Sequence, residues 1–280
     1  MKVEIKEGYL NGEDFYDYCT FSFEADNAWN HRNDMLQNIV KGKRIIHLGA
    51  ADHKMLIAEK IKKNTYLQKI LNDAAEMCIG LDINKDSVKE AQRLGIKNIY
   101  CMNMLTESSK VLDQLIVNIC KNEKIDYLIC GEMLEHIDDP VSFLKQLNEI
   151  YSPYIDKIVI TVPNAFRFAN IKNSLLGKEA INTDHRYWFT PYTLCKVVSM
   201  AGMKPKVIEF AGEKSGKTKL FLSLFKNNIC YENIILIAKF INNSAGMDMS
   251  KGGGGVIYYN SYLMAFILAK HVEYKWRKVV

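Results

Sequence analysis

The chain alternates short apolar runs with longer segments in which apolar residues recur every three or four positions. Such runs are typical of buried strands, and the wider spacing is typical of the helices that cover them. This alternation predicts an α/β fold with a doubly wound, mostly parallel sheet of seven strands. The final two strands lack a full crossover between them, which predicts an antiparallel last strand. The predicted strands span residues 43–49, 77–82, 98–102, 126–130, 157–162, 205–210 and 233–240.

Helices are predicted between these strands. Two of them have strong start signals, because Asp139-Pro140 and Thr190-Pro191 each place a capping side chain directly before a proline. The segment 164–190 contains only one short helical pattern, and a connection of this length is more typical of a substrate lid than of a plain linker. The predicted helices span 33–40, a start near 56, 86–94, 111–120, 141–150, 168–176, 191–202 and 219–225.

Residues 1–240 are predicted to form one domain, and residues 241–280 an appended tail. Gly252–Gly255 indicates a flexible linker. The aromatic and apolar run that follows, Val256–Leu268, is consistent with a helix packed back on the domain, with a dimer contact, or with peripheral contact of the tail with a membrane. The first reading is the simplest of the three, and an oligomeric state stays open.

Polar or small residues follow the predicted strands at their carboxyl ends. Gly49-Ala50-Ala51 follows the first strand, where small residues let backbone amides approach a ligand, although an ordinary strand-to-helix turn explains them equally well. Asp82 ends the second strand, and an acid in this place typically accepts hydrogen bonds from ribose hydroxyls. The alternative role for Asp82 is to cap the next helix.

The stretch Ile129–His136 brings two carboxylates and an imidazole directly behind a buried strand. Glu132, Glu135 and His136 can face one side of the turn that leaves this strand. Such a group can bind a metal or carry out acid and base chemistry, or it can be a helix-entry segment with solvated acids. Tyr187 and Trp188 are either acceptor platforms or core residues, and for Trp188 core packing against the last long helix is favoured.

Composition and charge exclude some classes of protein. The chain has 280 residues, a net charge of +5 and a pI near 8.6, and its basic residues are scattered, so we expect no nucleic-acid partner. The seven cysteines include no CxxC pair, which indicates reduced thiols and a cytoplasmic protein. The first residues lack the apolar core of a signal peptide, and no stretch has the roughly 18 apolar residues of a membrane span.

Five segments give the chain a recognisable resemblance: HLGAAD, IGLDIN, CGEMLEHIDDP, VPNAF and LLGKEAINTDHRYWFTP. Over about residues 29–240 the sequence resembles class I S-adenosylmethionine-dependent methyltransferases, and in detail the bacterial members often found in surface-polysaccharide gene sets. The resemblance implies a Rossmann-like methyltransferase fold and S-adenosylmethionine as cofactor. Ala51 and His53 depart from the family, which more often has glycines at these places.

The resemblance also implies the cofactor contacts. Gly49-Ala50-Ala51 would lie under the methionine part, Asp82 would bind the ribose, Asn103-Met104 would flank the adenine, and Cys130-Gly131 would line the floor near the sulfonium. Arg32 would pair with the cofactor carboxylate, and the alternative is that Arg32 is a solvated surface arginine. The full cofactor-binding set that we expect is Arg32, Leu48, Gly49, Ala50, Ala51, Asp82, Ile83, Asn103, Met104, Cys130 and Gly131.

The E-x-x-E-H arrangement resembles the magnesium site of ubiquinone-pathway O-methyltransferases and of small-RNA 2′-O-methyltransferases. In the latter a further histidine in a D-H…W-T segment completes the site, and Asp184–Thr190 stands in the corresponding place. The resemblance therefore implies a divalent metal, Mg²⁺ or Mn²⁺, on Glu132, Glu135, His136 and His185. The alternatives are that His136 or His185 acts as general base beside Glu135 without a metal, or that the motif is structural.

The function expected from these features is S-adenosylmethionine-dependent O-methylation of a hydroxyl, on a sugar or on a nucleotide- or phosphate-linked glycan precursor. N-methylation of an amino sugar or methylation of a phosphoryl oxygen would use the same cofactor site. An NAD-dependent oxidoreductase is disfavoured because the chain lacks G-x-G-x-x-G and a Tyr-x-x-x-Lys pair. A subunit that keeps the fold without turnover is a further alternative.

Overall fold

The computed structural model describes residues 1–23, 28–29, 31–105, 125–212 and 229–241. The predicted helices at 111–120 and 219–225, and the predicted tail beyond residue 241, lie outside the described residues. Of the described helices, none is long and apolar enough to cross a membrane.

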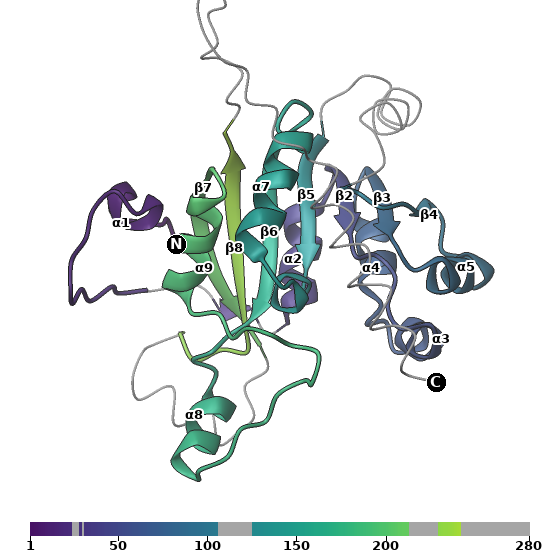
Figure 1. The fold of residues 1–280 in the computed structure, drawn as a ribbon. Coiled ribbons are helices and arrows are strands. Elements are labelled where there is room, and N and C mark those ends of the chain that lie inside the picture. The colour runs from purple at the N-terminus through teal and green to yellow at the C-terminus, as the bar shows by residue number, and fades with distance from the viewer. Residues whose placement is uncertain (24–27, 30, 106–124, 213–228, 242–280) are drawn as a thin grey trace, which may run out of the picture. The chain divides into compact units, whose positions relative to one another are not determined.

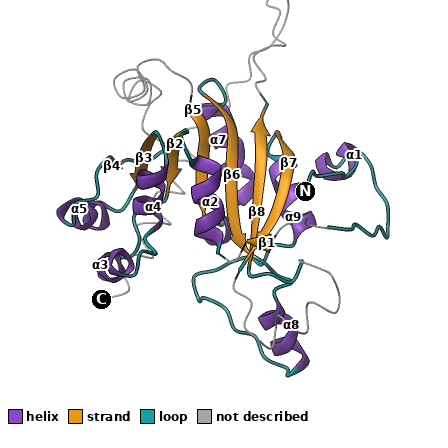
Figure 2. Cartoon of the chain, turned by 180° about the vertical axis from the view of Figure 1, so that it is seen from behind, coloured by secondary structure: helices purple, strands orange, loops and turns teal. Residues whose placement is uncertain are grey.

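A single eight-stranded sheet forms the centre of the fold, in the order β1-β7-β8-β6-β5-β2-β3-β4, which can be followed in Figure 2. β8 is antiparallel to both β6 and β7, and the other pairings are parallel. The predicted α/β sheet of seven strands with an antiparallel last strand is therefore confirmed. The strands are β1 Ala28–Trp29, β2 Arg44–Leu48, β3 Met77–Asp82, β4 Ile99–Cys101, β5 Ile125–Gly131, β6 Ile155–Pro163, β7 Met203–Ala211 and β8 Asn233–Phe240.

The eighth strand, β1, has only two residues and pairs with β7 at the edge of the sheet, where no apolar run signals it. Helices α1 and α4 were not predicted either, whereas the other described helices lie within a few residues of their predicted places. The helices are α1 Glu7–Asn11, α2 Arg32–Val40, α3 Lys54–Lys62, α4 Leu67–Ala74, α5 Lys85–Arg93, α7 Pro140–Tyr151, α8 Phe168–Leu175 and α9 Pro191–Met200, together with the 3-10 turn η1 Leu134–His136.

The core lies on both faces of the sheet. Leu147 of α7 and Leu194 of α9 belong to one buried cluster, and Leu36 of α2 and Leu71 of α4 belong to a second. All four side chains are fully buried, and each such leucine contributes about 2 kcal/mol of burial free energy. The sheet is thus doubly wound, as the alternating pattern predicts.

Both predicted helix starts are confirmed by their capping hydrogen bonds. The Asp139 carboxylate accepts a hydrogen bond of 3.0 Å from the Ser142 N–H, and Pro140 is the first residue of α7. Thr190 and Thr193 form a capping box at α9, which begins at Pro191. Caps of this kind stabilise a helix by about 1 kcal/mol each.

The carboxyl ends of the parallel strands meet at one edge of the sheet, at the bottom of Figure 1, where α8 also lies. The segment 164–190 is attached to this edge, because Asn164 forms a bridge with Phe189 and both are buried. Ligands of open parallel sheets bind outside this edge. The segment that the sequence indicates as a lid therefore borders the place where a ligand would bind.

Candidate functional site

The small-residue turn after β2 is held rigidly against β3. Gly49 adopts φ +67°, a conformation that side chains disfavour, and the Gly49 and Ala50 N–H groups both lie within hydrogen-bonding distance of the Leu81 carbonyl, at 2.9 and 3.2 Å. The buried Tyr66 hydroxyl donates a 2.9 Å hydrogen bond to the Ala50 carbonyl. The turn therefore has a fixed shape before any ligand binds.

Asp82 joins the turns that follow β2 and β3. Its two carboxylate oxygens accept hydrogen bonds from the Ala51 N–H at 2.9 Å and the Asn84 N–H at 2.8 Å. Burial raises the pKa of Asp82, and these two donors act in the opposite direction. The cap of α5 is Asn84, which accepts from the Ser87 N–H, so Asp82 is not needed for that role. Each Asp82 oxygen keeps a lone pair for a further donor.

The other predicted cofactor residues fall into two groups. Ile83 is 53% exposed at the end of β3, and Asn103 is half-buried beyond β4. Met104 is buried, and the side chains of Leu48 and Cys130 are fully buried in the core. Only the backbone of Leu48 and Cys130 can therefore reach a ligand, because both side chains point into the packed interior.

One polar residue in this region was missed by the sequence reasoning. His47 of β2 is buried, and its Nδ1 lies 2.7 Å from the Gln68 Oε1. Burial lowers the pKa of His47 to about 4, so the ring is neutral and Nδ1 donates to the amide oxygen. Gln68 is fully buried on α4, and it fills a core position that periodicity assigns to an apolar residue.

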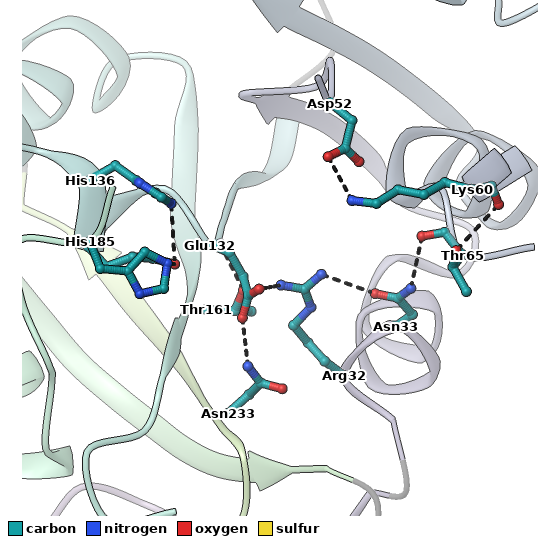
Figure 3. A network of polar contacts seen from close by, with 11 residues as sticks. Arg32, Asn33, Asp52, Lys60, Thr65, Glu132, His136, Thr161, His185 and Asn233 are labelled. Carbon is teal, nitrogen blue, oxygen red and sulfur yellow. Dashed lines mark hydrogen bonds and ion pairs between the residues drawn. The ribbon is translucent and has the colours of Figure 1, made fainter. Parts of the chain in front are cut away.

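Glu132 has the positive φ angle of +50°, which costs a non-glycine residue about 1–2 kcal/mol. Its N–H donates to the Thr161 carbonyl at 2.9 Å. This backbone turns the carboxylate toward Arg32, whose Nη1 lies 2.9 Å from Oε2, and toward Asn233, which donates to Oε1 at 2.6 Å. Figure 3 shows this carboxylate facing Arg32 and Asn233 rather than the two histidines.

A pocket of about 220 Å³ lies beside this ion pair. It is lined by charged and polar side chains together with one glycine, and two of these side chains are carboxylates. Because Asn233 begins β8 and Gly212 follows β7, the pocket lies at the ligand-binding edge of the sheet. The lining residues are His31, Arg32, Asn33, Glu132, Gly212, Glu232 and Asn233.

Glu135, His136 and His185 come together although the histidines are far apart in the sequence. The Nε2 atoms of His136 and His185 lie 4.0 and 3.9 Å from the same oxygen of Glu135, Oε1. The two imidazole rings meet edge to face with their centroids 4.7 Å apart. These distances are too long for hydrogen bonds, and they leave space between the three groups.

Glu135 is the least satisfied polar residue of this cluster. Its side chain is fully buried, and neither carboxylate oxygen has a hydrogen-bond partner among the described residues. Burial, with a smaller contribution from the nearby Glu132 charge, raises the pKa of Glu135 to about 8. A buried carboxylate without donors is unstable unless it binds a proton or a cation.

Hydrogen bonding orients the first histidine of the cluster. His136 Nδ1 lies 3.2 Å from the Asp184 carbonyl oxygen, which can only accept, so Nδ1 carries a proton, and the lone pair of the neutral ring is on Nε2. This lone pair is on the atom nearest Glu135. Burial and the neighbouring His136 lower the pKa of His185, which favours a neutral His185 ring.

Arg186 and Tyr187 fasten the lid segment to the turn that carries Glu135. The Arg186 N–H donates to the Glu135 carbonyl at 2.8 Å, and its guanidinium binds the Asp138 carboxylate and the His136 carbonyl. The Tyr187 hydroxyl donates to the Asp138 carbonyl at 2.7 Å. These contacts, which the sequence reasoning missed, bring His185 to Glu135.

The prediction of core packing for Trp188 is wrong. Its indole is partly exposed, donates a 3.1 Å hydrogen bond to Glu179 and lies under the Arg167 guanidinium, 4.8 Å from the ring centroid. Phe189 is buried at the corresponding core position with 3% exposure. The bridge of Phe189 to Asn164 turns the neighbouring Trp188 outward, because successive side chains of an extended segment alternate in direction.

The sequence profile of a protein family described as a methyltransferase domain matches residues 27–205, which is more than half of the chain. The chain belongs to this methyltransferase family. As its family implies, the methyltransferase uses S-adenosylmethionine as methyl donor, and the oxidoreductase alternative is excluded. No curated protein matches the chain.

Solved structures similar to the methyltransferase include three that are named as methyltransferases. The small RNA methyltransferase HEN1 shares 15% identity at a TM-score of 0.49, covering 75% of this chain and 25% of HEN1, so the chain spans a quarter of that protein. An S-adenosylmethionine dependent methyltransferase from Mesorhizobium loti shares 12% identity at 0.43, covering 73% and 96%. A putative methyltransferase from Bacillus halodurans shares 12% identity at 0.46, covering 75% and 99%.

Three of the four predicted metal ligands in the methyltransferase lie close enough to share an ion. One donor atom from each of Glu135, His136 and His185 lies within 4.8 Å of the others. An ion with bonds of about 2.1 Å separates its ligands by at most about 4.2 Å, so a small contraction is sufficient. The unsatisfied oxygens of Glu135 and the free lone pair of His136 fit such an ion. Glu132 is not in this group, because Arg32 and Asn233 hold its carboxylate.

Proposed function

We propose that this methyltransferase transfers a methyl group from S-adenosylmethionine to a hydroxyl of a sugar or of a nucleotide- or phosphate-linked glycan precursor, with the help of a divalent cation. One observation carries the proposal: the two oxygens of Glu135 are buried without a donor, and the Nε2 atoms of His136 and His185 both approach one of them. Carboxylate and imidazole ligands suit Mg²⁺, Mn²⁺ or Fe²⁺ better than a thiolate-preferring ion.

The reaction needs both alignment and removal of a proton. The acceptor oxygen forms a bond to the methyl carbon as the carbon–sulfur bond breaks, and the hydroxyl proton passes to a base. A divalent cation, when bound, supplies positive charge that lowers the pKa of an alcohol. Glu135, His136 and His185 would hold it. Glu132, the fourth ligand that the sequence resemblance implies, would have to leave Arg32 and Asn233 to join them.

The cofactor side of the proposal rests on the turns after β2 and β3. Asp82 is fixed by two backbone N–H groups and has a free lone pair on each oxygen, which suits two ribose hydroxyls. Gly49 and Ala51 present backbone close to this carboxylate. Arg32 would bind the cofactor carboxylate, for which it would share or release Glu132.

A sugar acceptor is supported by the pocket beside Glu132. Carboxylates and amides both hydrogen-bond hydroxyl groups well, and the pocket of about 220 Å³ contains Glu132, Glu232, Asn33 and Asn233. The pocket is small enough to favour one sugar ring over a long chain. A polyhydroxylated acceptor can therefore satisfy these groups when it displaces water.

A second route needs no cation and uses the same residues. His136 holds its proton on Nδ1, so Nε2 can accept the hydroxyl proton directly. Glu135 would then stabilise the imidazolium that forms, because its side chain lies beside both rings. The two routes differ in their response to chelation.

The test is methyl transfer to candidate nucleotide sugars, followed by mass spectrometry for one added methylene. We expect chelation to abolish the product and Mg²⁺ or Mn²⁺ to restore it, and Glu135→Ala and His185→Ala to remove it while S-adenosylmethionine still binds. Glu149→Gln, on the exposed face of α7, is the matched control and should retain full activity. Full activity after chelation would reject the cation, and full activity of either alanine variant would reject the site.

A further inference from the structure

A row of lysines crosses the sheet near the amino-terminal ends of its parallel strands, whereas the candidate site lies at their carboxyl ends. Lys157 of β6 lies directly opposite Lys239 of β8, and Lys239 lies directly opposite Lys204 of β7. Residues that face each other across neighbouring strands share one face of the sheet. All three side chains are exposed, so they form a lysine row, Lys157–Lys239–Lys204, on the surface.

The folding of the domain does not explain this lysine row. Like charges directly opposite each other on neighbouring strands are destabilising, and Lys239 faces a lysine on both sides. Among the described residues, the row's ion pairing is that of Lys204 with Glu7, at 2.7 Å between Nζ and Oε2. Lys157 lies over the Tyr127 ring at 5.7 Å. The row therefore retains a positive charge that is available to a partner.

The lysine row borders a second pocket, of about 460 Å³. Lys204 and Lys239 line it together with Lys206, and Asp156 is the carboxylate of its lining. The remaining lining residues include apolar ones, among them Phe240 and Ile241. The surface thus combines positive charge with apolar contact area, and this combination suits an anionic amphiphile better than a simple inorganic anion.

The last described residue, Ile241, also lines this pocket. Ile241 is 39% exposed and follows β8, whose end lies at the opposite edge of the sheet from α8 in Figure 1. Beyond it the sequence contains the glycine run Gly252–Gly255, the apolar and aromatic run Val256–Leu268, and then a basic group. That basic group consists of Lys270, Lys275, Arg277 and Lys278.

We propose that the lysine row is a docking surface for an anionic lipid bilayer. Basic residues near an anionic membrane are attracted by its surface potential, and an apolar and aromatic run with cations after it, later in the same sequence, provides the second contact that stable peripheral binding needs. The candidate site lies at the carboxyl ends of the parallel strands, so a membrane at the lysine row leaves that site open. This proposal is independent of the acceptor and of the cation.

The test is co-sedimentation of the full chain with vesicles. Wild-type protein should bind vesicles made of equal parts of phosphatidylglycerol and phosphatidylcholine, should not bind phosphatidylcholine alone, and should dissociate at high salt. Replacing the lysine row by K157Q, K204Q and K239Q together should weaken binding about 100-fold, since each lysine near the surface contributes roughly fivefold. This triple variant should melt no lower than wild type, because it removes like-charge neighbours.

The matched control is the triple variant K62Q, K85Q and K89Q. These lysines are also exposed, but they lie on α3 and α5. Helix α5 packs against β4, the outermost strand on the side of the sheet away from β7 and β8. The control removes the same charge and should bind anionic vesicles like wild type. Absence of wild-type binding to anionic vesicles would overturn the proposal, and so would equal loss of binding in the two triple variants.

Two further arms separate a bilayer from other polyanions. Leu263→Ser with Phe266→Ser keeps every charge of the tail and should weaken vesicle binding by about 100-fold or more, because two apolar contacts are lost. Unchanged binding by this variant would overturn a membrane contact. Binding of a single-stranded RNA through the lysine row, without binding to anionic vesicles, would overturn it in favour of a nucleic-acid partner.

Discussion

Two buried carboxylates, Asp82 and Glu135, lie at the same edge of the sheet and differ in their surroundings. Asp82 is 7% exposed, and both its oxygens accept hydrogen bonds from backbone N–H groups. Glu135 is fully buried, and neither oxygen has a partner among the described residues. Burial raises the pKa of both carboxyl groups. The Asn84 and Ala51 N–H groups oppose the rise at Asp82, whereas at Glu135 the backbone N–H of the same residue opposes it and the pKa still rises to about 8.

The difference indicates two kinds of binding. Asp82 is held in place before a ligand arrives, so it can select hydroxyl groups without reorganising. Glu135 is stable in the folded chain only as the neutral acid or beside a cation, since an unpaired buried charge is strongly destabilising. The two imidazole nitrogens that approach it, Nε2 of His136 and Nε2 of His185, favour the cation. We therefore regard Asp82 as part of the donor side and Glu135 as part of the acceptor side.

The largest expected effect is that of Glu135→Gln. The variant keeps the size of the side chain and loses the charge, so methyl transfer should fall more than about 100-fold while S-adenosylmethionine affinity is unchanged. Product formation by mass spectrometry and cofactor titration by calorimetry measure the two quantities. A loss of cofactor affinity in the same variant would contradict the assignment of separate roles to Asp82, at the cofactor, and Glu135, at the acceptor.

Asp82→Ala should have the opposite signature. The loss of charge-assisted hydrogen bonds to a ribose should lower S-adenosylmethionine affinity about 10- to 100-fold, and Mn²⁺ binding should be unaffected. Calorimetric titrations with each ligand give both values. Asp86→Ala, at an exposed position of α5, serves as control for the loss of an acid from this region. Unchanged cofactor affinity in Asp82→Ala would remove Asp82 from the donor side.

His47, a buried histidine near Asp82, should make the stability of the fold depend on pH. Burial lowers its pKa from about 6.5 to about 4, so between these pH values the unfolded chain takes up a proton that the folded chain does not. The contribution of His47 to the free energy of unfolding should be fully present above pH 6.5 and should fall by about 3 kcal/mol as the pH drops toward 4. His47→Asn should lose this part of the pH dependence in urea unfolding. An unchanged pH profile would show that His47 takes up a proton without unfolding.

The smallest effect is expected for Arg186→Ala, which removes the guanidinium contacts between the lid segment and the turn of Glu135. His185 should then be less well placed, and Mn²⁺ affinity should fall about tenfold, the effect typical of residues that orient metal ligands. Cofactor affinity should stay constant. Titration with Mn²⁺ tests this expectation. Equal Mn²⁺ affinity in wild type and variant would mean that the guanidinium contacts of Arg186 do not position His185.

Much of the fold follows from local patterns. β3 and β8 begin and end where their apolar runs do, and the starts of α7 and α9 follow from Asp139-Pro140 and Thr190-Pro191. By contrast, α4 was missed because its buried face includes Gln68, whose burial makes sense only with His47 of β2 as partner. A contact between distant elements has no local signal.

The site divides in the same way. We expected His185 to approach Glu135 because of the family resemblance. The number of residues between them could not predict it, because a segment of that length does not fix the distance between its ends. The position of Glu132 could not be predicted, since it depends on a positive φ angle and on Arg32 and Asn233 from two other elements. Trp188 faces outward because Phe189 occupies the core, and an aromatic pair does not reveal which ring is buried.

The most direct test of the central claim is a titration of chelator-treated protein with Mn²⁺, followed by the electron paramagnetic resonance signal of the free ion. We predict that wild type and Glu149→Gln bind one ion per chain, and that Glu135→Gln binds none at the same concentrations. Equal binding by wild type and Glu135→Gln, or no binding by wild type, would contradict the assignment of Glu135, His136 and His185 to a cation.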